Sequence, residues 1–143
     1  MLTPDDKQFV ARFEALALAP GTFDHKAHLR LAFLCIMQDG LEPAVQRVGR
    51  GIYAFADSLG ASDKYHQTIT EALVRMIGLR LTRQPAPDWP SFLATNQDLV
   101  HQAKELLLQH YSPERLFSAE ARIRFLEPDR HPLEDTECTP LVK

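Results

Sequence analysis

Cysteine is scarce in this sequence. The chain has only two cysteines, Cys35 and Cys138, and no Cys-x-x-Cys motif. This scarcity excludes the usual thiolate zinc sites and dithiol redox motifs. A chain of 143 residues is also long enough to fold without disulfide bonds or a structural metal. We therefore expect two reduced thiols, with Cys35 in an apolar helix and Cys138 in a polar tail.

Long hydrophobic runs and a basic excess are also missing. The longest apolar stretch, Leu31–Met37, has seven residues, whereas a membrane-spanning helix needs roughly 20. The first nine residues carry acids and lack the apolar core of a signal peptide, so we expect a cytoplasmic protein with no membrane partner. The net charge is −3, whereas nucleic-acid-binding proteins usually carry a basic excess. We therefore expect no nucleic-acid partner.

Helical periodicity, by contrast, runs through most of the chain, and no strand-like alternation of useful length occurs. Thr3 and Asp24 are typical N-caps for the first two helices, and Gly40 is a typical stop for the second. Apolar spacing predicts helices within 4–18, 24–39, 41–59, 63–83 and 96–111, and a last short helix within 118–125. The sequence therefore predicts an all-α fold, most simply an antiparallel helical bundle of about five helices.

Prolines divide the chain in two places. The segment 84–90 holds three of them and interrupts the helical pattern, but it is too short to link two domains. From 127 onward, Pro128, Pro132 and Pro140 alternate with acids. We therefore expect a single helical domain over 1–126 and an extended C-terminal tail over 127–143.

Three of the six histidines carry the functional prediction. His25 and His28 form a His-x-x-His motif at the start of one expected helix, and His66 lies near the start of another. Residues three apart share a helix face, so the first two imidazoles can converge. In an up-down bundle the second and fourth helices run in the same direction, which places both starts at one end. We therefore expect His25, His28 and His66 to meet in one central space.

Three converging imidazoles with open positions are typical of a catalytic metal site. The expected metal is a divalent transition metal (zinc, iron or copper), because the ligand type alone does not select among them. Tyr65 and Thr70 would orient a small-molecule substrate, and the positive ends of the two helices favour an anionic group on it. The leading hypothesis is therefore a metal-dependent enzyme, either a hydrolase or an oxidoreductase.

Other interpretations of the same residues stay open. The histidines can act without metal as acid–base or hydrogen-bonding groups, or they can simply complete helix ends. The alternative function is a metal-free small-ligand-binding or regulatory module that works with a partner protein. In that case Trp89, Phe92 and Phe117, which lie near the late breaks, would form an exposed contact surface. A homo-oligomer is compatible with either hypothesis.

Two motifs, at 23–29 and 64–70, resemble those of a group of small, poorly characterised bacterial helical proteins. These proteins share F-x-H-x-x-H-L early in the chain and K-Y-H-x-T-x-T in its middle, and a late segment similar to 125–129 with Pro132 and Leu133. The resemblance spans most of residues 20–133 and implies no particular activity. It implies that the three histidines form one functional unit, and that Pro128 and Asp129 fold over that unit.

Overall fold

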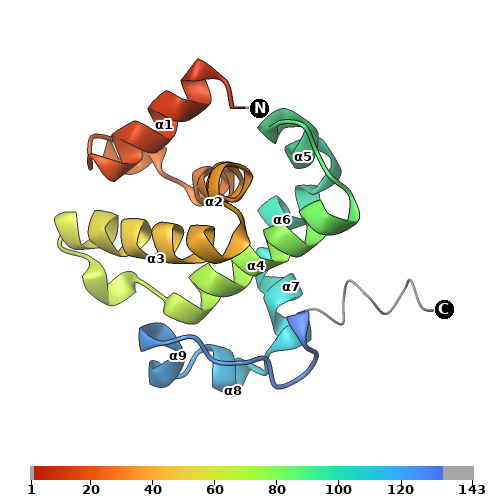
Figure 1. Cartoon of the computed structure of the whole chain (residues 1–143). Helices are drawn as coiled ribbons and strands as arrows, with labels where there is room; N and C mark the ends of the chain where they lie inside the picture. The colour runs from red at the N-terminus through yellow and green to blue at the C-terminus, as the bar shows by residue number, and fades with distance from the viewer. Residues whose placement is uncertain (1, 134–143) are drawn as a thin grey trace.

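The structure is a computed structural model that describes residues 2–133, and these residues form helices and no β-strand (Figure 1). The α-helices are α1 (Pro4–Glu14), α2 (His25–Asp39), α3 (Leu41–Ser58), α4 (Gln67–Arg83), α5 (Trp89–Thr95), α6 (Gln97–His101), α7 (Ala103–His110), α8 (Pro113–Leu116) and α9 (Ala119–Ile123). Two 3₁₀ helices, η1 (Pro20–Thr22) and η2 (Ser62–Lys64), precede α2 and α4. The all-α class is confirmed. Within the described part of the chain, no helix has the length and apolar character that crossing a membrane requires.

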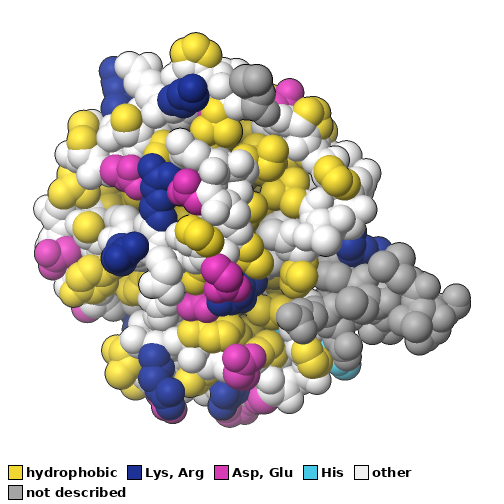
Figure 2. All heavy atoms as spheres, viewed as in Figure 1, with side chains coloured by type: hydrophobic (Ala, Val, Ile, Leu, Met, Phe, Trp, Pro, Cys, Tyr) yellow, Lys and Arg dark blue, Asp and Glu magenta, His cyan; other side chains and the backbone are white. Residues whose placement is uncertain are grey.

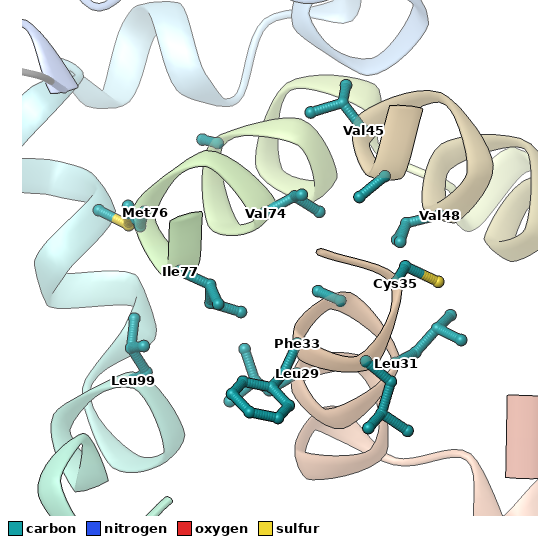
Figure 3. Close-up of a cluster of buried hydrophobic side chains, with 14 of the residues drawn as sticks. Leu29, Leu31, Phe33, Cys35, Val45, Val48, Val74, Met76, Ile77 and Leu99 are labelled. Atoms are coloured by element: carbon teal, nitrogen blue, oxygen red, sulfur yellow. The ribbon is translucent and has the colours of Figure 1, made fainter. Parts of the chain in front are cut away.

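Helix α2 is the centre of the fold. It packs against α1, α3, α4, α5 and α6, and Figure 1 shows it nearly end-on among them. Its buried residues are Leu29, Leu31, Ala32, Phe33, Leu34 and Cys35. Figure 3 labels four of them, and these point in several directions: Cys35 lies toward Val48 on α3, while Leu31 lies on the side away from Ile77 on α4. A helix that is apolar around most of its circumference is a core helix rather than a surface helix.

The helix ends follow local chemistry that the sequence predicted. The Thr3 hydroxyl accepts the Asp6 N–H, while the Asp6 carboxylate accepts the Thr3 N–H, which forms a reciprocal capping box. Asp24 accepts the Ala27 N–H at 2.9 Å and begins α2. Gly40 ends α2 with φ of 88°, a backbone conformation that favours glycine. These three predicted caps are confirmed.

Two predicted boundaries are wrong. Helix α4 begins at Gln67 rather than near Asp63, because Ser62–Lys64 forms a 3₁₀ turn and His66 itself is the N-cap. The single helix expected over 96–111 is broken at Gln102 into α6 and α7. The break lets α6 pack on α2 while α7 packs on α4. The described residues thus form nine α-helices, several of only one or two turns, and the antiparallel arrangement of about five stays a prediction.

The expected contact surface near the late breaks is wrong for two of its three aromatic residues. Trp89 and Phe92 are buried, and their ring centroids lie 5.7 and 5.2 Å from that of Phe33 on α2. The proline-rich segment 84–90 turns the chain so that α5 returns to the central helix. Phe117 is the one aromatic of the three that is exposed, at 52%.

Charged side chains form mixed groups on the surface. Figure 2 shows lysine and arginine beside aspartate and glutamate on the face that it displays. Arg47 bridges Glu14 on α1 and Asp39 on α2, while Arg75 contacts Glu42 and Glu71. The Arg75–Glu71 pair lies within α4, whereas the other three join neighbouring helices and contribute at most about 1 kcal/mol each.

Residues 124–132, which follow α9, return along the bundle without forming a helix. Thr68, fully buried on α4, donates its hydroxyl to the Arg124 carbonyl at 2.8 Å and accepts the Leu126 N–H at 3.1 Å. Tyr111 donates to the Leu126 carbonyl at 2.7 Å, and Leu133 is buried. Residues 127–132 of the expected tail are non-helical, and the segment that leads into them is packed on the bundle. Residues 134–143, which include Cys138 and Pro140, lie outside the described residues.

The Thr68 hydroxyl should contribute more to the free energy of unfolding than the hydroxyl of a threonine that bonds only within its own helix. Thr68→Val keeps the side-chain shape but leaves two backbone groups without their partner, so we expect a loss of about 2 kcal/mol in the free energy of unfolding. Thr82→Val is the matched control, because the Thr82 hydroxyl is exposed and bonds only within α4. Urea titration of both variants measures the difference. Equal losses would contradict the proposed anchoring.

Candidate functional site

A cavity of about 730 Å³ lies among α2, α3, α4 and α7, a size typical of sites for drug-sized ligands. Its walls are mostly apolar and come chiefly from Leu29, Ala32, Val48, Ile52, Phe55, Leu59, Ile69, Leu73, Val74, Ile77, Leu107 and Leu116. All five site residues predicted from the sequence line it: His25, His28, Tyr65, His66 and Thr70. The structure therefore brings the two motifs to one shared space.

His25 occupies the first position of α2, directly after the Asp24 cap. Its Nε2 lies 2.9 Å from the Leu99 carbonyl on α6. Because a carbonyl only accepts hydrogen bonds, Nε2 carries the proton, and in the neutral ring Nδ1 keeps the lone pair. His25 thus ties the start of the central helix to α6 and has one nitrogen left for another partner.

His66 has no nitrogen left. As the N-cap of α4 it accepts the Ile69 N–H at Nδ1, at 3.1 Å. Its Nε2–H donates to the Leu116 carbonyl on α8 at 2.8 Å. Burial, together with the nearby Arg122, lowers its pKa below the usual value, which keeps Nδ1 unprotonated for the cap. The ring therefore acts as a structural clamp between α4 and α8.

His28 differs from His25 and His66 in its hydrogen bonding. It is half-buried, one turn into α2, and its ring meets Phe23 edge-on at a centroid distance of 4.3 Å. Burial lowers its pKa to about 4, and the neighbouring His25 adds to the effect while Asp24 opposes it. No residue within 2–133 forms a hydrogen bond with its ring nitrogens. His28 therefore lines the cavity as a neutral imidazole with one N–H and one lone pair available to a ligand.

Tyr65 and Thr70 lie on either side of the His66 cap. The Tyr65 hydroxyl donates to Gln67 Oε1 at 2.6 Å, and burial raises its pKa to about 12, so the phenol is protonated at neutral pH. A Cβ at Gly49 would lie 3.3 Å from this hydroxyl, so glycine allows the close approach. Thr70 is half-buried one turn beyond His66. Their predicted catalytic roles stay predictions.

The hydrogen bonds that the histidine ring nitrogens already form bear on the predicted metal centre. Two of the three histidines use Nε2 to donate to carbonyls, and His66 also uses its second nitrogen. The set of His25, His28 and His66 therefore does not offer three free nitrogens in this arrangement. Over residues 2–133, no three histidine, cysteine, aspartate or glutamate side chains are grouped so as to hold a metal ion. The metal stays a prediction that elemental analysis can test.

Two later parts of the chain lie away from the histidine cavity. His110 does not line it, and the Nδ1 of this ring lies 2.9 Å from the His131 carbonyl. The segment that the family resemblance placed over the histidines also lies elsewhere. Pro128 lines a different cavity together with Leu79, and Asp129 accepts the N–H and hydroxyl of Ser112.

Sequence reasoning missed two lysines at the site. Lys64 and Lys104 line the cavity and are exposed to solvent. Lys64 lies within the motif at 64–70, so its position next to Tyr65 and His66 could have indicated that it lies at the site. Lys104 lies in the first turn of α7, directly after the break at Gln102.

Comparisons with protein-family models, with curated proteins and with solved structures found no match for this chain.

The buried His28 should make stability depend on pH. Its pKa is about 4 in the folded chain against 6.5 for the unperturbed group, so the unfolded state binds the proton first. Folding stability is therefore lost as pH falls from about 6.5 to 4, by an amount on the order of 2–3 kcal/mol. His28→Phe removes this titration, and urea unfolding at several pH values should show a shallower decline.

His101→Phe is the control for this experiment, because His101 is exposed on α6. That variant should keep the pH dependence of the parent. Some slope should also remain in His28→Phe, since burial lowers the pKa of His66 in the same direction. A His28→Phe protein with the full parental slope would contradict the assignment.

His66 should behave as a cap rather than as a metal ligand. His66→Ala removes the acceptor for the Ile69 N–H, so we expect a loss of about 1–2 kcal/mol in unfolding free energy. His66→Asn restores an N-cap oxygen and should recover part of the loss. The differences should be the same with and without a chelator in thermal or urea unfolding. A loss that vanishes in chelator would instead favour a metal-linked role.

Proposed function

We propose that the protein is a metal-free module that binds a small, largely apolar molecule in the histidine cavity. The observation that carries this proposal is His28, a neutral imidazole that lines the apolar cavity and has no hydrogen-bond partner within residues 2–133. The two ring nitrogens of His28 form no hydrogen bond with the described residues, so both are available to a ligand in the cavity. A ligand that supplies the missing hydrogen bond gains both that contact and the burial of its own apolar surface.

The apolar walls set the scale of the expected affinity. A ligand that hides about 300 Å² of apolar surface gains roughly 7 kcal/mol from removal of that surface from water. Association and ordering costs subtract several kcal/mol. We therefore expect dissociation constants from micromolar to submillimolar for simple apolar probes, within reach of fluorescence titration.

The metal-dependent enzyme is the second candidate. Its support is that three imidazoles line one cavity. Metal binding at all three would require His66 to give up at least one of its two hydrogen bonds. Elemental analysis of tag-free protein decides between the candidates. Near-stoichiometric zinc, iron or copper that disappears in His28→Phe would overturn the metal-free proposal.

Filling the cavity should abolish binding of a neutral apolar probe. Ala56 lines the cavity from α3, so Ala56→Phe should lower the affinity for N-phenyl-1-naphthylamine by about tenfold or more through steric exclusion. Ala54→Phe is the matched control on the same helix, because Ala54 is exposed and does not line this cavity. Fluorescence titration measures both dissociation constants.

His28→Phe provides a second test of the binding proposal. It keeps an aromatic ring in place, so it should preserve binding of purely apolar probes and weaken probes that carry a hydrogen-bonding group. Circular dichroism checks that each variant is folded. The proposal fails if the parent binds no apolar probe, whether neutral or charged, or if Ala54→Phe lowers affinity as much as Ala56→Phe does.

A further inference from the structure

The charged groups around the histidine cavity are of one sign. Lys64, at the end of η2, and Lys104, on α7, both line it. Among the described residues that line the cavity, there is no aspartate or glutamate. The charge at the cavity is therefore positive, although the chain as a whole has 19 acidic and 16 basic side chains.

Neither lysine is neutralised by a neighbour. No residue within 2–133 forms an ion pair with Lys64 or Lys104. Lys104 places its ammonium group 5.8 Å from the ring centroid of Phe117, a half-exposed aromatic that also lines the cavity. The exposed cavity lysines can therefore pair with a ligand at low desolvation cost, whereas Arg47 and Arg75 are already paired with carboxylates.

Depth separates the polar and apolar parts of the site. The two lysines are exposed, whereas Val48, Val74 and Ile77, which also line the cavity, are buried. His28 adds no charge to the cavity at neutral pH, because burial lowers its pKa to about 4. A ligand suited to the whole site has a negative group at its solvent end and an apolar body inside.

We infer that the natural ligand is an organic acid of this form, with one carboxylate near Lys64 and Lys104 and an apolar body in the cavity. This inference rests on the proposed function and specifies its ligand class. A cationic amphiphile is disfavoured by repulsion from both lysines. A neutral one would leave both ammonium groups unused.

A matched ligand series tests the inference. Decanoate, 1-decanol and decyltrimethylammonium share one apolar chain and differ in head-group charge. In displacement of N-phenyl-1-naphthylamine at low salt, below the micelle concentrations, decanoate should bind about tenfold tighter than decanol, with decyltrimethylammonium weakest. Raising the salt to about 0.5 M should reduce the preference, because these charges are exposed.

The lysine variants locate the effect. Lys64→Gln and Lys104→Gln should each weaken decanoate about threefold to tenfold and leave decanol unchanged. Lys7→Gln, at an exposed site on α1 that does not line the cavity, removes the same charge and should change neither. Equal affinity of the parent for decanoate and decanol would overturn the acid inference and leave the proposed apolar binding intact. Absence of binding by all three compounds and by the fluorophore would remove both.

Discussion

The fold depends on the burial of α2. Because this helix packs against α1, α3, α4, α5 and α6, the side of its N-terminal turn that carries His28 is partly buried, while Lys26 stays exposed. His28, three residues into the helix, is therefore partly removed from water without a hydrogen-bond partner for its ring within residues 2–133. The low pKa of His28 is the direct result. The cavity lies where α2, α3, α4 and α7 leave this turn incompletely covered.

The three histidines show how one residue type acquires different roles from its backbone position. His66 precedes the first turn of α4, so its ring accepts the Ile69 N–H of that turn and donates to the Leu116 carbonyl of α8. His25 follows the Asp24 cap and reaches a carbonyl of α6. His28 is one turn further on, where the helical backbone is already satisfied, so the cavity is the remaining direction for its hydrogen bonds.

The features that can be predicted from the sequence are those determined by interactions between residues only a few positions apart. Thr3, Asp24 and Gly40 mark helix ends by local hydrogen bonding and backbone conformation, and the structure has each as predicted. The convergence of the two histidine motifs followed from helix order. The break at Gln102 did not, because the competition between α2 and α4 for neighbouring apolar faces is a long-range effect. The His66 cap was missed since histidine is an uncommon N-cap, and its choice depends on Leu116, 50 residues away.

The same distinction explains why the sequence favoured a metal. Spacing shows which imidazoles share a face, but it does not show which of their nitrogens already have hydrogen-bond partners. Once the carbonyls of Leu99 and Leu116 are in place, two histidines are committed to holding helices together. What remains, over residues 2–133, is an apolar space lined by an imidazole without a hydrogen-bond partner for its ring and by exposed ammonium groups. A ligand that binds only the folded chain stabilises it, so a compound that fills this space and hydrogen-bonds with His28 would raise the free energy of unfolding.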